Sequence, residues 1–149
     1  MKLFRIDGSL IIDKPDIDNL KELVEYCVRE GISLHHSDLQ DANMQGADMR
    51  GANMRGADLQ DANMQGANMQ YANMHHSDLQ DANMQGANMQ YANLQFANMQ
   101  GADLFNANLQ DANLQDANLQ DANLRRVILR GADMRDANLR RVILRDTDF

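Results

Sequence analysis

Two pairs of adjacent histidines stand out first, because imidazole is a common metal ligand and can act as a general acid or base. The pairs are His35–His36 and His75–His76, and they lie 40 residues apart. In the periodic chain described below, this offset places the pairs about 10 Å apart at a coil rise of about 4.8 Å. Zinc ligands lie about 2 Å from the ion, so the pairs cannot share one metal. We therefore expect no metal and no other cofactor.

The remaining catalytic signatures are missing from the sequence. No Gly-rich phosphate loop, nucleophile elbow or zinc spacing occurs. Gly46, Gly66 and Gly86 recur at a fixed interval and are expected at corners of the chain. Cys27 has no cysteine partner and lies on the apolar face of a predicted helix, so we expect it in the core. A regular convex rod offers no enclosing cleft, and we expect no enzymatic activity.

Composition and charge restrict the class of protein. The 149 residues carry a formal charge of −8 with a pI of about 4.7, which argues against direct nucleic-acid binding. Tryptophan is absent and aromatic residues make up 5%, which indicates a thin interior. The N-terminus lacks the apolar run of a signal peptide, and no stretch is long enough to cross a bilayer. We expect a cytoplasmic protein, in a reducing compartment compatible with one cysteine.

A five-residue repeat dominates the sequence. From Leu34 to Leu144 every fifth residue is Leu or Met, and Phe149 occupies the next position. A small residue, usually Ala, stands two positions earlier, with Asn or Asp between them. A period of five suits neither a helix, whose apolar residues would spiral around the axis, nor a flat strand, where each Leu would change face. The pattern is consistent if Ala and Leu/Met both point inward along a short extended piece that ends in a corner.

The segments QDANMQGANMQYANM (60–74) and QDANLQDANLQDANL (110–124) resemble the pentapeptide-repeat family. The resemblance covers residues 34–149. It implies an all-β fold, a right-handed quadrilateral β-helix with four pentapeptides per coil, and often homodimerisation. The recurrence of QDANMQGANMQYAN after 20 residues independently indicates the same coil length, and gives about six coils. Residues 1–33 are predicted to form an N-terminal cap of a β-hairpin and a helix over about Asp18 to Glu30.

Stacking at an offset of 20 predicts one acidic face. Its candidate residues are Asp38, Asp41, Asp58, Asp61, Asp78, Asp81 and Asp121. Residues 34–124 hold eleven Asp and two Arg, a net of −9, or about 0.4 charges per Å at a coil rise of about 4.8 Å. Duplex DNA carries about 0.6 negative charges per Å of its helix axis. The face is either a solubilising surface or a surface that binds a partner.

Aromatic residues stack on two other columns, Tyr71 over Tyr91 and His76 over Phe96. Tyr71, Tyr91 and Phe96 are candidate contacts for a partner, or else packing pairs that stabilise neighbouring coils.

The C-terminal residues differ in charge and pattern from the rest. Seven Arg and four Asp after residue 124 give a net of +3, and the two RRVIL units place Ile where Asn or Asp belongs. The candidate residues for self-association at this end are Arg126, Ile128, Arg141, Ile143 and Phe149. The alternative is local overpacking that ends the stack.

Two functions remain open. Gyrase-protecting members of the family are acidic rods thought to imitate duplex DNA, and this chain is similar in shape class and charge sign. That resemblance implies a non-enzymatic protein that binds a basic, DNA-binding groove of a topoisomerase or another DNA-binding enzyme. The chain departs from those members in its short length and its lack of a loop insertion or a C-terminal dimerisation helix. The alternative is a scaffolding array, consensus-like or designed, whose acidity serves solubility alone.

Overall fold

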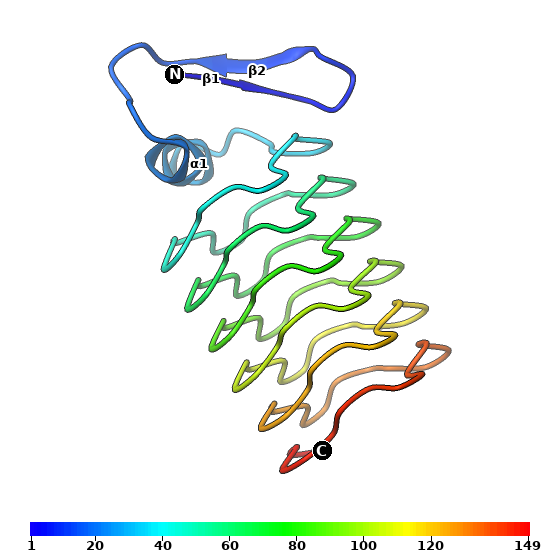
Figure 1. Cartoon of the computed structure of the whole chain (residues 1–149). Coiled ribbons are helices and arrows are strands. Elements are labelled where there is room, and N and C mark those ends of the chain that lie inside the picture. Colours follow the sequence, from blue (N-terminus) through cyan, green and yellow to red (C-terminus); the bar gives the residue numbers. More distant parts are fainter.

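The computed structural model describes all 149 residues and shows a stack of coils closed at one end by a hairpin and a helix (Figure 1). Strand β1 (Lys2–Phe4) pairs antiparallel with β2 (Leu10–Asp13), and the predicted turn lies between them with Gly8 at φ +80°. Helix α1 (Leu20–Arg29) follows, two residues shorter at its start than predicted. It begins after Asn19, whose side chain accepts a hydrogen bond from the amide of Glu22 at 2.8 Å.

From residue 34 onward the chain winds so that residues 20 apart are neighbours, as the repeated 20-residue offset predicted. The amide of Leu39 donates to the carbonyl of Asp58 at 2.8 Å, and the amide of Asp58 donates to the carbonyl of Ser37 at 2.9 Å. The same two hydrogen bonds recur along the stack. Each contact forms an isolated parallel bridge, as between Asp38 and Asp58, so the short extended pieces that the sequence predicted pair through single bridges and form no longer strands. The extended pieces are too short for a ladder because a corner recurs at every fifth residue.

The corners have left-handed backbone. Every fifth residue from His36 to Asp146 has a positive φ, between 53° and 71°. Gly46, Gly66 and Gly86 occupy such corners, as predicted, and glycine adopts this conformation without strain. Bulky residues also occupy them, including Tyr71 at φ 61°.

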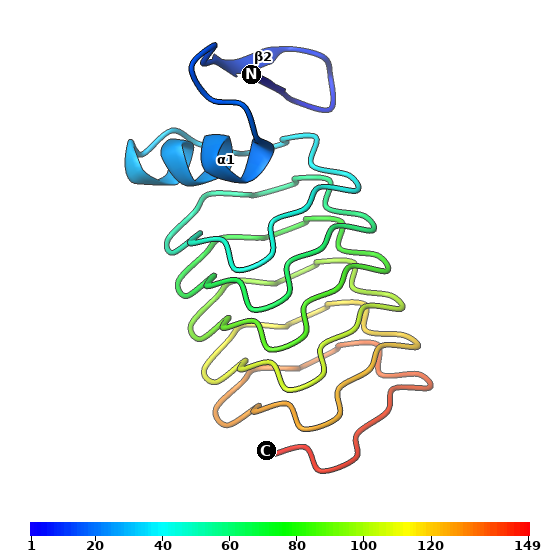
Figure 2. The same cartoon turned by 60° about the vertical axis from the view of Figure 1, so that its left-hand side comes forward.

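The core is one continuous column of apolar side chains. Alanine and Leu/Met of each repeat are buried from Leu34 to Leu129, and Leu23, Val24 and Cys27 of α1 join the same cluster. Figure 2 shows α1 lying across the first coil. Burial ends in the last coil, where Leu139 and Leu144 are exposed. The chain contains no helix with the length and apolarity of a membrane span.

Candidate functional site

The predicted acidic face consists of two columns. Asp38, Asp58 and Asp78 are joined by successive parallel bridges, so their side chains emerge from neighbouring coils on the same side. Asp41, Asp61 and Asp81 stand at the adjacent corners, each with φ 56–57° and each exposed. The structure therefore brings six of the seven predicted acidic residues together.

The seventh acidic residue lies apart from the other six. Gly101 occupies the corner between Asp81 and Asp121 and interrupts the column. The carboxylate of Asp121 lies 4.0 Å from the Arg141 guanidinium, which reduces the negative potential there. The continuous part of the face ends at Asp81.

The structure assigns the Asp side chains a local role that sequence reasoning missed. The Oδ1 atom of Asp58 accepts a hydrogen bond from the amide of Gln60 at 3.1 Å, and Asp78 does the same for Gln80. Asparagine serves equally well elsewhere, since Asn63 Oδ1 accepts from the amide of Gln65 at 3.2 Å. An uncharged side-chain acceptor thus serves at this position as well as a charged one. The negative charge of the face is additional to what the fold needs.

Corner side chains lean in one direction along the stack. The His36 ring lies over Gly56, the Asp81 carboxylate over Gly101, and the Asp111 carboxylate over Gly131, in each case 20 residues later. Each occupies the space that a Cβ atom on the glycine would take. The corner side chains therefore pack against the following coil, toward the C-terminal end.

The predicted aromatic columns form two stacks. The rings of His76 and Phe96 lie 4.9 Å apart at 12°, and His75 meets Phe96 edge-on at 5.6 Å. Tyr71 and Tyr91 stack in the same way at another corner. The negative charge of Asp111 raises the pKa of Tyr91. These rings pack against one another, while Tyr71, Tyr91 and Phe96 keep exposed edges available for a partner.

The C-terminal end of the stack is open. The amides of Met134, Leu139 and Leu144 have no acceptor among the 149 residues, because the carbonyls that pair with such amides lie 19 residues further along the chain. Val127 points inward and is buried, and Ile143 is 49% exposed, as predicted for the RRVIL units. Phe149 is 66% exposed, and Ile128 is half-buried beside Asn108 and Asp148. Arg126 and Arg141 stand at exposed corners.

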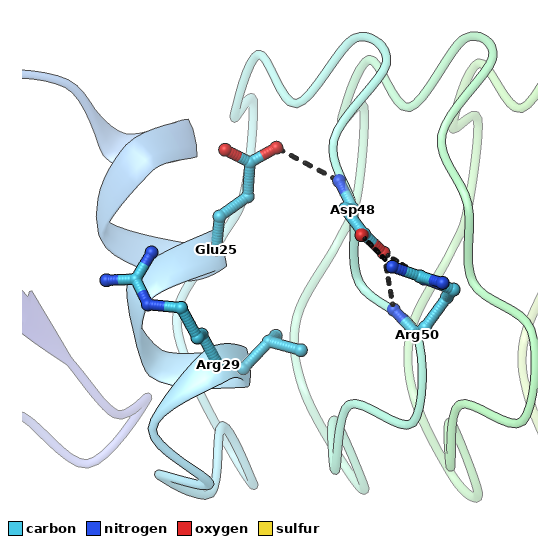
Figure 3. A pocket seen from close by; sticks show the side chains of 5 residues that line it. Glu25, Arg29, Asp48 and Arg50 are labelled. Carbon is cyan, nitrogen blue, oxygen red and sulfur yellow. Dashed lines mark hydrogen bonds and ion pairs between the residues drawn. The ribbon is translucent and has the colours of Figure 1, made fainter.

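A cavity of about 570 Å³ lies between α1 and the first coil (Figure 3). Glu25 accepts a hydrogen bond from the amide of Asp48 at 3.0 Å, and the Asp48 carboxylate binds Arg50 at 2.6 and 2.8 Å. Arg50 holds the pKa of Asp48 below its ordinary value. Lys21 also donates to the Gln45 carbonyl at 3.0 Å. These charged groups are already paired, and the contacts of Glu25 and Lys21 with the first coil hold α1 against the stack.

Titratable groups elsewhere form no metal cluster. No group of three or more His, Cys, Asp or Glu is placed to hold an ion. Cys27 is fully buried, and burial raises the pKa of its thiol, which disfavours the reactive thiolate. Sequence reasoning gave no role to Arg5, which lies near the His35–His36 pair in a second cavity described below.

Comparison with known proteins identifies the repeat. The family model described as pentapeptide repeats matches residues 32–70, 67–106 and 107–146, with eight copies. No match was found among the curated proteins.

Several solved structures are similar to the chain. A pentapeptide repeat protein, alr5209 from Nostoc PCC 7120, is 31% identical with a TM-score of 0.61, and the match covers 71% of this chain and 84% of that one. A pentapeptide repeat protein from the cyanobacterium Cyanothece 51142 is 35% identical with a TM-score of 0.38, covering 62% and 63%. QnrB1, a plasmid-mediated fluoroquinolone resistance protein, is 22% identical with a TM-score of 0.43, covering 72% and 60%. The chain thus spans less than two thirds of the latter two proteins.

The family model covers most of the chain, and the inward Ala and Leu/Met pairs at a 20-residue offset are the structural counterpart of its repeat. The chain therefore belongs to the pentapeptide-repeat family.

Proposed function

We propose that this protein is a non-catalytic binding protein whose acidic face occupies the basic, DNA-binding groove of a partner protein, with a topoisomerase such as DNA gyrase as the leading candidate. The observation that carries the proposal is the bridged succession of Asp38, Asp58 and Asp78 beside the corner column of Asp41, Asp61 and Asp81. Regularly spaced carboxylates on a narrow rod supply the charge pattern that such a groove accepts from phosphates.

The proposal also includes the number and handedness of the coils and the role of the N-terminal residues. We propose about six right-handed coils over residues 34–149, with residues 1–33 as a separate cap that covers one end. A cap of this kind prevents uncontrolled pairing at the exposed edge of the first coil. The buried Cys27 is compatible with a reducing, cytoplasmic location.

The open C-terminal coil supports a homodimer. Unpaired amides and exposed apolar side chains lie together there, and a second copy of the same end would cover both. In a dimer, two acidic faces would lie along one longer rod.

A scaffolding role, in which the acidity serves solubility alone, is favoured by one specific observation. The Asp58 and Asp78 side chains both bind backbone amides, so each has a reason to be present that involves no partner. Solubility would account for the choice of Asp over Asn at these positions.

The two functions differ in what the corner carboxylates do. We expect the triple variant Asp41→Asn, Asp61→Asn and Asp81→Asn to lose the effect of the protein on gyrase supercoiling, with and without quinolone. The matched control is Asp111→Asn, Asp116→Asn and Asp136→Asn, which removes the same charge from corner positions outside the face.

The outcomes separate the candidates. Loss confined to the first triple, with binding that weakens as salt rises, supports the proposed face. Unchanged supercoiling at micromolar wild-type protein contradicts the gyrase form of the proposal. If pull-downs from bacterial lysate at low and moderate salt are also empty, the scaffold is favoured.

A further inference from the structure

A second cavity, of about 470 Å³, lies between the β1–β2 hairpin and the first coil. It is lined by Arg5, Ile6, Asp7, His35 and His36. The amide of Ile6 donates to the carbonyl of His36 at 2.9 Å, and backbone hydrogen bonding therefore fixes the hairpin against the coil. Figure 1 shows the hairpin beyond the N-terminal end of the stack. The hairpin and the first coil thus form the two walls of the cavity.

The Arg5 side chain has more donors than its surroundings satisfy. Its Nη1 atom makes two long contacts, to Ser9 Oγ at 3.4 Å and to the Leu10 carbonyl at 3.5 Å. Its Nε atom is buried without a partner. A guanidinium carries five N–H donors in a fork suited to an oxyanion, and an unpaired buried donor in a folded protein calls for an explanation.

Unsatisfied polar atoms gather at this end of the molecule. The structure holds three buried side-chain atoms without a hydrogen-bond partner: Arg5 Nε, Ser37 Oγ and His75 Nδ1. Ser37 forms an antiparallel bridge with Arg5, and it directly follows His36 in the chain. Two of the three unpaired atoms therefore belong to residues in or next to the cavity.

The charge of the cavity depends on its two histidines. Hydrogen bonds from Ser9, with the nearby charges of Arg5 and His36, hold the pKa of Asp7 below its ordinary value. Asp7 is therefore ionised and balances the charge of Arg5. Histidine is the side chain whose charge changes between about pH 5 and 8. The cavity is near neutral when His35 and His36 are neutral, and positive when they are protonated.

Basic groups continue below the cavity along the same corner. The His36 ring lies over Gly56, next to Arg55, and the His75–His76 pair occupies the following coil. Arg5 and Asp7 of the hairpin line the cavity together with the histidines, and the amide of His36 donates to the carbonyl of Arg55 in the next coil at 2.9 Å. Burial, His76 and Arg55 lower the pKa of His75, which is consistent with a locally positive surface on an otherwise acidic rod.

We propose that the cavity formed by Arg5, His35 and His36 binds a tetrahedral oxyanion, either a free one or the phosphate of a phosphomonoester, when the two histidines are protonated. The Arg5 fork supplies hydrogen bonds to two oxygens, and the two histidines that line the same cavity add positive charge when protonated. The cavity is larger than one oxyanion, which leaves room for the group that carries a phosphate. The site is separate from the acidic face and goes beyond the function proposed above.

The test is calorimetric titration of the full chain with sulfate, which keeps its charge across the pH range used. At constant ionic strength we expect the dissociation constant for sulfate to be about tenfold lower at about pH 5.5 than at about pH 7.5. Arg5→Gln and His36→Asn should each weaken binding about tenfold at the lower pH. Asparagine tolerates the left-handed backbone at position 36, where φ is 53°, so the fold should be retained, which circular dichroism checks.

The matched control is His76→Asn, at the same corner two coils away, which should leave sulfate binding unchanged. Histidine NMR signals provide a second readout, in which sulfate should shift the His36 resonances and leave those of His76 in place. Equal affinity at both pH values, or wild-type affinity in His36→Asn, overturns the proposal. Equal weakening in His76→Asn also overturns it, because it shows general attraction to the basic strip. Phenyl phosphate distinguishes the two sources: tighter binding than sulfate assigns the site to a phosphomonoester, and equal binding to a free oxyanion.

Discussion

The rings of Tyr71 and Tyr91 stack in parallel, with their centroids 5.0 Å apart and their planes 5° apart. They stand at corners of successive coils, and 64% and 46% of their respective surfaces remain exposed. We expect Tyr71→Ala and Tyr91→Ala to be coupled by about 0.5–1.5 kcal/mol in the free energy of unfolding, as for other aromatic pairs. Urea denaturation of both single variants and the double variant measures this coupling. Strictly additive effects would assign the rings to a partner surface instead of to packing.

The repeated Asn side chain is expected to stabilise each coil through its oxygen. Asn88 Oδ1 accepts a hydrogen bond from the amide of Gln90 at 3.2 Å. Asn88→Ala leaves that amide without its acceptor and should lower the free energy of unfolding by about 1 kcal/mol. Asn88→Asp keeps the oxygen, and its bridge neighbours Asn68 and Asn108 carry no charge, so it should be nearly neutral. Chemical denaturation at neutral pH compares the two variants, and equal losses would contradict the assigned role of Oδ1.

The stability of the fold should fall as the pH drops through the histidine range. Burial, with the charges of His76 and Arg55, lowers the pKa of His75 in the folded state. Below about pH 6.5 the unfolded chain therefore binds a proton that the folded chain resists, and the free energy of unfolding decreases with falling pH. Glutamine occupies the same column at Gln95 and Gln115, so His75→Gln should keep the fold and reduce this slope. Denaturation between about pH 7 and 5 in sulfate-free buffer measures it, and an unchanged slope would contradict the prediction.

The open C-terminal coil gives a prediction for oligomeric state. Ile143 and Leu144 are 49% and 42% exposed beside unpaired backbone amides. If this end forms a homodimer, Ile143→Lys should shift the mass from that of two chains to that of one, because a charge would be buried in the interface. Leu10→Lys, at a residue 47% exposed on the hairpin, is the control and should leave the mass unchanged. Light scattering gives both masses. A monomeric wild-type chain would exclude the homodimer at the concentration measured.

The repeat could be predicted from sequence because one physical constraint acts at every position. Only a small residue and a Leu or Met fit the interior, so their spacing revealed both the inward pieces and the 20-residue offset that the bridge from Asp38 to Asp58 confirms. The corner at Gly46 was predicted from the fixed register of the repeated glycines, and the structure adds that its backbone is left-handed. The short extended pieces that the spacing predicted are also present, and each makes a single parallel bridge to the next coil.

The contacts between the cap and the stack could not be predicted, because they obey no repeat. Nothing in the spacing of Arg5 and His36 indicates that a hairpin places them in one cavity. The pairing of Asp121 with Arg141 was also missed. The prediction followed the Asp residues down one column and did not consider that the next residue in that column, Arg141, is positively charged. The role of Asp58 Oδ1 as a backbone acceptor could have been found, because Asn and Asp alternate at that position while sharing this oxygen.

The lean of the corner side chains gives the outer surface a direction. His36, Asp81 and Asp111 each cover the glycine corner that lies 20 residues after them. A substitution at one corner therefore alters the contacts of the corner 20 residues later. A glycine has no side chain to make such a contact, so Gly101 separates Asp81 from Asp121 in their column. The outer residues of one stretch of coils can thus differ from those of the next without contact between them wherever a glycine corner lies in between, while the interior sequence stays the same.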